Sequence, residues 1–422
     1  MTSGQPDRLH TQSQQFCMRI DHLLVLASNY PSPAQPTYGT FVREFARAVA
    51  RQGVRTSVIA PVAIQRRARW PNGFPQRSIE KVEQGNELTV FRPAYLSVSA
   101  REQFSRLGPL NPSLLTLRQF TSAVRRVVKR EHLAPDAVYG HFLYLPGASA
   151  VHIGQELDIP SFPCMGEGEF WTVRRFGFAR AREELKPAQG FIANSTALKG
   201  MLQKDLLIPP DSIGVFPNGT DLSKFKPHPM LAARRHFGLP EEPLLVCSVG
   251  NFLEGKGVAR VAEAIDALDG VQGVFAGSGP VPPRCANTAL CRRVSHDEIP
   301  LLLSACDVFA LPTVIEGSSN ALVEAMACGL PIISSLGEFN DDLLTPEVAI
   351  RLDPYDVSAL RNAVVTLRDG PELRRKMAAA ALARAAAFDV SERARRILQF
   401  MHERMETTRG SHSPAARGRA WA

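Results

Sequence analysis

The chain has 422 residues, 45% of them hydrophobic, and a formal net charge of +8, so it is long enough for two domains and suited to an acidic partner. Its seven cysteines include no Cys-x-x-Cys pair, which argues against structural zinc and against a disulfide framework. No apolar run reaches roughly 18 residues and the N-terminus lacks the order of a signal peptide, so we expect a cytoplasmic chain that neither spans a membrane nor is exported.

Short apolar runs alternate with helical patterns from one end of the chain to the other. Candidate strands are residues 23–27, 56–60, 88–91, 137–140, 191–194, 213–216, 244–249, 274–276, 308–311, 332–335 and 349–352. Candidate helices include residues 41–52, 114–131, 258–268, 297–305, 320–328, 358–367 and 392–405. This alternation predicts parallel sheets with crossover helices. The predicted fold class is α/β, with two doubly wound, Rossmann-like domains that face each other across a deep cleft.

Two basic clusters lie in the first half of the chain. The first holds Arg66, Arg67 and Arg69 with Trp70, and the second holds Arg118, Arg125, Arg126, Lys129 and Arg130 with Phe120. The second cluster, read with a helical period, forms the basic face of an amphipathic helix. A solvated helix face is the simplest interpretation, and peripheral contact with an anionic membrane is the alternative. No nucleic-acid motif accompanies either cluster, so we expect no nucleic-acid partner.

A proline-rich stretch over residues 209–229 interrupts the periodicity, and we place the interdomain hinge there. The predicted domains are residues 18–208 and residues 209–389. Ligands are expected in the cleft, at the carboxyl ends of the strands. The ends of the chain, residues 1–17 and 407–422, are polar and without period, and are predicted to be flexible tails.

A glycine-rich turn follows the predicted strand at residues 244–249. Gly250, Gly255 and Gly257 would let the backbone approach a phosphate closely, and Lys256 supplies a mobile cation beside it. The spacing matches neither a Walker loop nor a dinucleotide fingerprint. An ordinary strand-to-helix turn with a surface lysine remains the alternative.

Glu316 and Glu324 lie eight positions apart in the most informative segment of the chain. We expect Ser318 or Ser319 to cap a short helix that begins near Asn320, so that its free amides form an anion site. A carboxylate also accepts hydrogen bonds from vicinal hydroxyls. The segment therefore suits a ligand that is both phosphorylated and polyhydroxylated, namely a nucleotide sugar. Solvated glutamates are the simpler alternative.

Together these segments resemble the retaining glycosyltransferases of family 4, which share the two-domain GT-B fold. The spacing from Glu316 to Glu324 matches the family's Glu-x7-Glu signature, Pro217-Asn218-Gly219 falls in its expected order, and Gly39 resembles its N-terminal glycine loop. The resemblance covers residues 19–405 and is stronger in the second half. It implies an acceptor-binding first domain, a nucleotide-sugar-binding second domain, and a final helix at about residues 390–406 that crosses back onto the first domain.

The resemblance also implies the roles of individual residues. Glu324 would hold the nucleotide ribose, Glu316 would lie against the donor sugar, and Lys256 would neutralise the departing diphosphate. Further residues that would bind the substrate are Gly39, Gly250, Asn251, Val294, Gly317, Ser318, Ser319 and Asn320. We expect metal-independent catalysis with no cofactor besides the nucleoside diphosphate sugar that serves as donor.

The sequence departs from the family pattern at three places. Asn251 stands where many relatives carry an arginine that contacts the diphosphate, and residues 334–340 replace a frequent Gly-Gly loop. Residues 164–169 read Cys-Met-Gly-Glu-Gly-Glu where relatives often have His-Gly. We therefore expect His141, Glu167 or Glu169 to serve the acceptor side.

These features predict a hexosyltransferase-type enzyme that acts on a glycan or lipid-linked acceptor in cell-surface polysaccharide or glycolipid biosynthesis, with peripheral contact to the inner membrane face as a hypothesis. Two alternatives are a nucleotide-sugar epimerase on the same fold and a non-catalytic nucleotide-sugar-binding protein. The epimerase would isomerise the donor without an acceptor, and the binding protein would bind the donor without turnover.

Overall fold

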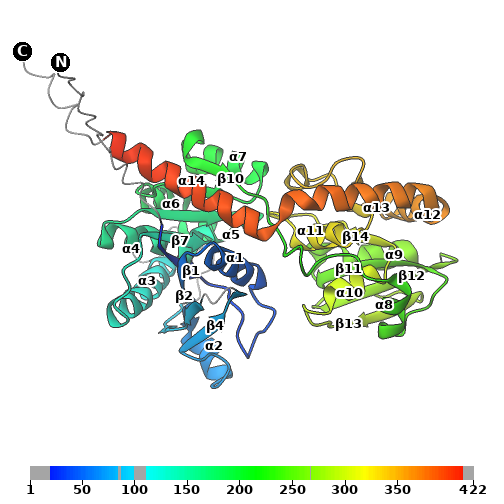
Figure 1. The fold of residues 1–422 in the computed structure, drawn as a ribbon, viewed down its shortest axis with the longest axis horizontal. Coiled ribbons are helices and arrows are strands. Elements are labelled where there is room, and N and C mark those ends of the chain that lie inside the picture. The colour runs from blue at the N-terminus through cyan, green and yellow to red at the C-terminus, as the bar shows by residue number, and fades with distance from the viewer. Residues whose placement is uncertain (1–19, 84–86, 99–110, 267, 412–422) are drawn as a thin grey trace, which may run out of the picture.

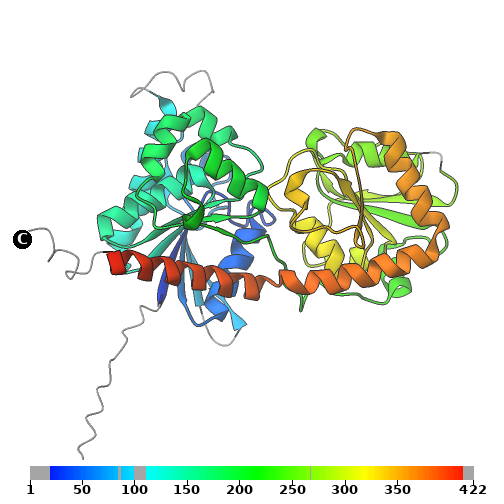
Figure 2. The same ribbon diagram turned by 90° about the horizontal axis from the view of Figure 1, so that it is seen from above.

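The computed structural model describes residues 20–83, 87–98, 111–266 and 268–411, so the tail expected at residues 1–17 lies outside the described residues. Two α/β units stand next to each other, each built on a mainly parallel sheet (Figure 1). The last helix, α14 (Val390–Ser411), leaves the second unit and runs along the first (Figure 2). The predicted α/β class with two doubly wound units is confirmed. Helix α14 continues through residues 407–411, where a flexible tail was predicted.

The first unit contains an eight-stranded sheet in the order β10-β9-β8-β7-β1-β2-β5-β4, parallel except where β4 meets β5. Its strands are β1 (His22–Ala27), β2 (Arg55–Ile59), β4 (Arg77–Lys81), β5 (Glu87–Phe91), β7 (Ala137–His141), β8 (Ser161–Met165), β9 (Phe191–Ala193) and β10 (Ile213–Val215), and β3 (Val62–Ala63) pairs separately with β6 (Ala94–Tyr95). Its helices are α1 (Thr40–Arg51), α2 (Ile64–Arg69), α3 (Pro112–Arg130), α4 (Ala148–Leu157), α5 (Trp171–Phe176), α6 (Phe178–Leu185) and α7 (Thr196–Leu206). Every residue of β1 is buried because helices cover both faces of the sheet.

The second unit contains a six-stranded parallel sheet in the order β13-β12-β11-β14-β15-β16. Its strands are β11 (Leu244–Asn251), β12 (Val271–Ser278), β13 (Thr288–Arg292), β14 (Val308–Leu311), β15 (Ile332–Ser335) and β16 (Ala349–Leu352). Its helices are α8 (Met230–Phe237), α9 (Val258–Ile265), α10 (Ile299–Ser304), α11 (Asn320–Ala327), α12 (Val357–Asp369) and α13 (Pro371–Ala385). The carboxyl ends of β11 and β14 lead directly into the glycine-rich turn and the Glu316 segment.

The boundary predicted at residue 209 is too early. Strand β10 pairs in parallel with β9 and therefore belongs to the first sheet, so the first unit extends to about Phe216. The strand has only three residues and prolines stand on both sides of it, which hid its membership from the sequence pattern.

Two further differences from the sequence reading have clear physical causes. Strand β8 was not predicted because Pro163 interrupts it, yet it lies between β7 and β9 in the middle of the sheet. Phe120, grouped with the basic cluster, is fully buried against the sheet, since α3 turns its apolar face inward. The predicted basic helix itself is confirmed as α3.

The chain crosses between the two units twice, and the two crossings are hydrogen-bonded to each other. The Thr220 amide donates to the Phe388 carbonyl at 2.9 Å, and the Val390 amide donates to the Thr220 carbonyl at 2.9 Å. Beyond this junction, α14 packs on α1 and on the first sheet through Ala394, Ile397 and Met401. Within the described ranges, no helix combines the length and the apolar character needed to cross a bilayer.

Candidate functional site

Lys256 and Glu316 are brought together at the carboxyl edge of the second sheet. Lys256 lies in a short 3-10 turn (Glu254–Lys256) after β11, and the segment after β14 is fastened to this turn because the Val314 amide donates to the Gly255 carbonyl at 2.8 Å. The two side chains form an ion pair and are 28% and 20% exposed. Partial burial reduces the screening of this pair by water. An anion that enters beside Lys256 would therefore compete with Glu316 for the ammonium group.

The Glu316 loop is in close contact with the first unit. A Cβ atom added to Gly317 would lie 2.1 Å from the Gly166 carbonyl oxygen, and one added to Gly168 would lie 2.8 Å from the Glu316 carbonyl carbon. Real Cβ atoms essentially never approach other atoms this closely, so only glycine fits at both positions. The site is thus formed by both units, with residues 166–168 packed on the Glu316 loop.

Ser318 does not cap α11 as one reading of the sequence expected. Its hydroxyl accepts a hydrogen bond from the Asn218 amide at 3.0 Å, and its carbonyl accepts one from Asn218 Nδ2 at 2.9 Å. Ser319 occupies the N-cap position and makes no side-chain capping bond. The Asn320 Oδ1 atom is buried without a hydrogen-bond partner in the described part of the chain, and as an acceptor it suits a ligand hydroxyl. The anion site depends instead on the absence of a side-chain cap. The start of α11 therefore keeps amide groups that a bound anion could satisfy.

Glu324 faces the first unit from inside α11. Its Oε1 atom lies 3.5 Å from His296 Nε2, and the two side chains are 12% and 22% exposed. A small cavity joins Glu324 and Asn320 to Thr40 and Phe41 at the start of α1. Glu324, like the Glu316 loop, is therefore positioned at the interface between the units.

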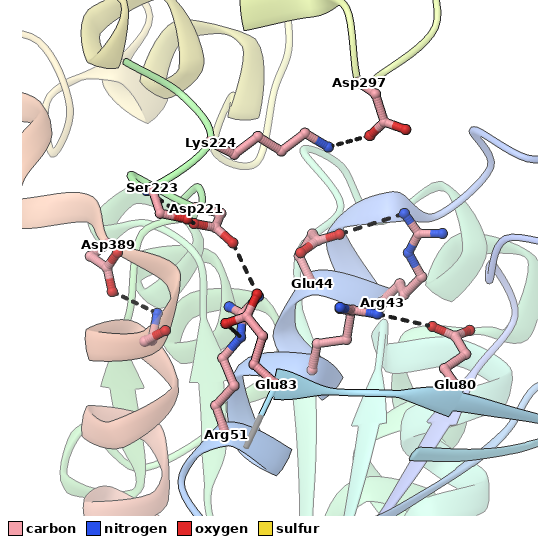
Figure 3. A network of polar contacts seen from close by, with 12 residues as sticks. Arg43, Glu44, Arg51, Glu80, Glu83, Asp221, Ser223, Lys224, Asp297 and Asp389 are labelled. Carbon is pink, nitrogen blue, oxygen red and sulfur yellow. Dashed lines mark hydrogen bonds and ion pairs between the residues drawn. The ribbon is translucent and has the colours of Figure 1, made fainter. Parts of the chain in front are cut away.

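A chain of polar contacts follows the first crossing between the units (Figure 3). Arg51 of α1 donates to Asp221 at 3.1 Å, and Asp221 accepts a hydrogen bond from the Ser223 amide at 3.0 Å. Burial alone would raise the pKa of Asp221, but the hydrogen bonds from Ser223 and the charge of Arg51 hold it below its usual value. Further along, Lys224 pairs with Asp297 at 2.5 Å and approaches His296 Nδ1 at 3.5 Å. These contacts connect His296, which lies beside Glu324, to the crossing.

On the side of the first unit, His141 ends β7 and is buried. Its Nδ1 atom is hydrogen-bonded to the Tyr139 hydroxyl at 2.7 Å, whereas Nε2 has no hydrogen-bond partner among the described residues. Burial, together with the positive charge of Arg393, lowers the pKa of His141 to about 3. The ring is therefore neutral at physiological pH and packs against the rings of Phe41 and Phe142.

Glu167 lies in the loop that contacts the Glu316 segment. Its carboxylate accepts hydrogen bonds from the Leu143 and Gly166 amides, both at 3.2 Å. Burial raises the pKa of Glu167 to about 7 despite these bonds, so its carboxyl changes charge near neutral pH. The loop after β7 that it holds contains Phe142 and Leu145, whose φ angles are 82° and 62°. Such strained backbone persists only where the surroundings enforce it.

The other predicted site residues differ in their surroundings. Gly39 has a φ of 80° and stands at the N-cap of α1, next to Thr40, which lines the cavity with Glu324. A Cβ at Gly39 would lie 2.5 Å from the Asn29 backbone. Gly250 has a φ of 140° with open space beside it, and Asn251 is exposed at the end of β11. Val294 packs partly on the core of the second unit, and Glu169 is half-buried beyond Gly168.

Sequence reasoning gave no role to several side chains that the fold brings to the site. Glu44 and Thr40 belong to α1, and Asn194 follows β9 and donates from Nδ2 to Asn218 Oδ1 at 3.0 Å. The only signal for Asn194 is its position directly after an apolar run. Within the ranges that the structure describes, no three His, Cys, Asp or Glu side chains gather as a metal site would require.

Comparison with known proteins gives matches along most of the chain. The family model described as Glycosyltransferase Family 4 matches residues 38–224, and the one described as Glycosyl transferases group 1 matches residues 231–384. The Bacillus subtilis protein named "Putative teichuronic acid biosynthesis glycosyltransferase TuaC" is 26% identical over 359 residues, which cover 81% of this chain and 88% of TuaC.

Solved structures share the fold over nearly the whole chain. The sucrose-phosphate synthase of Thermosynechococcus elongatus has a TM-score of 0.73 at 20% identity, and the alignment covers 92% of this chain and 100% of that one. Anabaena Alr3699/HepE in complex with UDP has a TM-score of 0.67 at 17% identity, with 91% and 100% covered. At these identities the likeness establishes the fold, which is the expected GT-B arrangement.

Proposed function

The chain belongs to glycosyltransferase family 4, and on that premise we propose that it transfers a sugar from a nucleoside diphosphate donor to a glycan or lipid-linked acceptor, with retention of configuration and without a metal ion. The observation that carries this proposal is the meeting of Lys256 and Glu316 beside the uncapped start of α11. A cation, free amides and a carboxylate within one cleft suit a ligand that carries both a diphosphate and a sugar.

In the proposed donor complex, the diphosphate takes the place of Glu316 as the partner of Lys256. The released Glu316 carboxylate is then available to the donor sugar, and the amides at the start of α11 bind phosphate oxygens. Glu324, held near His296, accepts hydrogen bonds from the ribose hydroxyls. The complex of Anabaena Alr3699/HepE with UDP supports a nucleotide donor for this fold.

The proposed chemistry follows from where charge develops. As the glycosidic bond to the diphosphate breaks, positive charge grows on the sugar ring and negative charge grows on the leaving group. Lys256 and the amides at the start of α11 stabilise the leaving group. They compensate in part for the arginine that many relatives carry at the position of Asn251. In this proposal Glu316 stabilises the positive charge that develops on the sugar carbon.

Glu167 is the side chain best suited to the acceptor among those predicted for that role. Its pKa of about 7 allows it to accept a proton from an acceptor hydroxyl near neutral pH. His141 is neutral, and its free Nε2 atom can exchange a hydrogen bond with a sugar hydroxyl. Glu169 lies beyond Gly168 and has no assigned part in the proposal.

A role in cell-surface polysaccharide synthesis is supported by the name of the relative TuaC, which refers to teichuronic acid. We extend the proposal to membrane contact through α2 and its neighbours. Ile64 is 49% exposed there, and Arg69 lies over the Trp70 ring. In α3, by contrast, Arg125 and Arg126 bond to Glu156 and to the Ala94 carbonyl, so they are less available to lipid.

Vesicle flotation tests the membrane contact. Wild type should float with vesicles that contain anionic lipid and stay behind with neutral ones. The double variant Arg66→Glu, Arg69→Glu should lose flotation, whereas the exposed Arg375→Glu should keep it. Equal recovery of wild type from both vesicle types would refute this part of the proposal.

Nucleotide release from UDP-, GDP- and ADP-sugars tests the enzymatic proposal, with and without a chelator. Wild type should release nucleotide in the presence of acceptor, the product should keep the anomeric configuration, and the chelator should have no effect. Lys256→Ala and Glu324→Gln should each slow nucleotide release. The control variants Lys376→Ala and Glu347→Gln should not, because both residues are exposed and lie outside the segments of the proposed site. Isomerised donor without acceptor would favour an epimerase, and binding without turnover would favour a binding protein.

A further inference from the structure

A second cavity lies where the two crossings between the units meet. It has a volume of about 330 Å³, within the range of small-ligand sites, and shares no lining residue with the cavity at Glu324. Three arginines line it: Arg384 near the end of α13, and Arg393 and Arg396 on α14. Thr196, at the start of α7, and Asp342 complete its polar wall. Nothing in the proposed reaction uses this cavity.

The hydrogen bonds of the arginines leave donors unused. Arg384 donates from Nε to the Leu343 carbonyl at 3.1 Å and from Nη2 to the Asp342 carbonyl at 2.6 Å. Arg393 donates from Nε to the Pro217 carbonyl at 2.9 Å and from Nη2 to Asn194 Oδ1 at 3.0 Å. Within the part of the chain that the structure describes, Nη1 of either arginine donates to no acceptor.

Arg396 is held less firmly than the other two arginines. It is exposed, lies over the Phe216 ring at 5.8 Å from the ring centre, and has no hydrogen-bond or ion-pair partner among the described residues. The carboxylate of Glu392, one turn earlier on α14, is already bound by Arg395 at 2.7 Å. Arg396 therefore adds a positive charge to the mouth of the cavity, which the nearby Glu392 carboxylate offsets only in part.

Asp342 is the one carboxylate in the wall of the cavity, and it is occupied. It accepts hydrogen bonds from the Thr196 amide at 2.6 Å and from the Thr196 hydroxyl at 2.7 Å. A carboxylate already sits at the start of α7, as the helix dipole favours. Three guanidinium groups line the cavity against this one lining carboxylate, so its wall carries a net positive charge.

We propose that this hinge cavity is a binding site for a phosphate group, held by the free guanidinium donors of Arg384, Arg393 and Arg396. Planar guanidinium groups match the oxygens of a phosphate, and several of them around one cavity favour an oxyanion over a neutral ligand. The phosphate belongs either to a small soluble molecule or to a lipid headgroup. Because Arg384 comes from the second unit while Arg393 and Arg396 lie on the helix that packs on the first, the bound anion links the two units at their hinge.

Calorimetric titration of the full chain with inorganic phosphate and with glycerol 3-phosphate, at constant ionic strength, tests the proposal. Arg396→Ala removes the least structural of the three arginines and should weaken phosphate binding at least about tenfold, since a charged hydrogen bond is lost. Arg375→Ala is the matched control, because this exposed arginine of α13 does not line the cavity and its partner Glu372 does not either. Lys256→Ala, in the donor site, should leave the hinge affinity unchanged. Flotation of the same variants with vesicles of neutral lipid to which phosphatidic acid has been added tests whether the phosphate belongs to a lipid headgroup.

Saturable binding of soluble phosphate that Arg396→Ala weakens and the two controls retain would support the proposal with a soluble ligand. Flotation that depends on phosphatidic acid and on Arg396, without soluble binding, would support it with a lipid headgroup. Three outcomes would overturn it: absence of both kinds of binding, equal weakening by Arg375→Ala, or loss of phosphate binding in Lys256→Ala alone. These titrations use no sugar donor, so their outcome is independent of the proposed transferase reaction.

Discussion

Gly317→Ala should damage the site while leaving both units folded. The new Cβ would lie 2.1 Å from the Gly166 carbonyl oxygen, which is 0.9 Å short of the 3.0 Å that real Cβ atoms keep. Both partners are backbone, so neither can rotate away, and the Glu316 loop must separate from residues 166–168 by about that amount. A misplacement of about 1 Å in a catalytic group can lower a rate about 100-fold. We therefore expect kcat/KM for sugar transfer to fall by about two orders of magnitude.

Gly255→Ala is the matched control for this substitution. Gly255 lies in the same Lys256 turn, its Cβ would meet no atom within 4 Å, and its φ is not positive. Initial rates of nucleotide release, measured at several donor concentrations, would compare the two variants with wild type. Thermal unfolding should change little in either, because the units can separate slightly at their interface. Full activity in Gly317→Ala would refute the packing of the Glu316 loop against the first unit.

Three further predictions concern other parts of the site and the hinge. Glu167→Gln should abolish the part of the pH–rate profile with an apparent pKa near 7; an unchanged profile would contradict the assignment. Burial raises the pKa of Glu167 from 4.5 to about 7, so the neutral carboxyl stabilises the folded state, and this stabilisation is lost as pH rises through 7. The free energy of unfolding of wild type, measured with urea, should therefore fall more between pH 5 and pH 8 than that of Glu167→Gln. Arg393→Ala leaves the Pro217 carbonyl without its arginine donor and leaves Asn194 Oδ1 with only the 3.5 Å contact from the Cys164 thiol. It should therefore lower the free energy of unfolding by about 3 kcal/mol, whereas the exposed Arg395→Ala should change it by less than about 0.5 kcal/mol. Similar urea midpoints would rule out a structural role for Arg393.

The sequence was sufficient for the fold class because the strands are long, apolar and separated by helical patterns, as in β1 and β11. Prediction from the sequence failed where the local residue preferences disfavour the secondary structure that the folded chain adopts. Pro163 disfavours the strand that surrounds it, and β10 is too short to show any period, so β8 was missed and the first unit was ended too early. Only packing against neighbouring strands stabilises these two elements.

The part of the candidate site that the second unit contributes could be predicted from the sequence, whereas the part that the first unit contributes could hardly be predicted at all. Glu316, Glu324 and Lys256 stand in segments whose glycines and serines are unusual for ordinary surface loops, and the fold brings the first and last of these together. The raised pKa of Glu167 depends on its burial and on amides from Leu143 and Gly166, which no spacing in the sequence reveals. The role of Ser318 in binding Asn218, a hundred residues away, depends in the same way on the folded chain.

The central claim is that Lys256 binds the diphosphate of the donor and that Glu324 binds its ribose. Calorimetric binding of the preferred nucleoside diphosphate and of its nucleoside, to wild type, Lys256→Ala and Glu324→Gln, tests this division most directly. We predict that Lys256→Ala weakens the diphosphate and leaves the nucleoside unchanged, and that Glu324→Gln weakens both. Equal affinity of Lys256→Ala and wild type for the diphosphate would contradict the account.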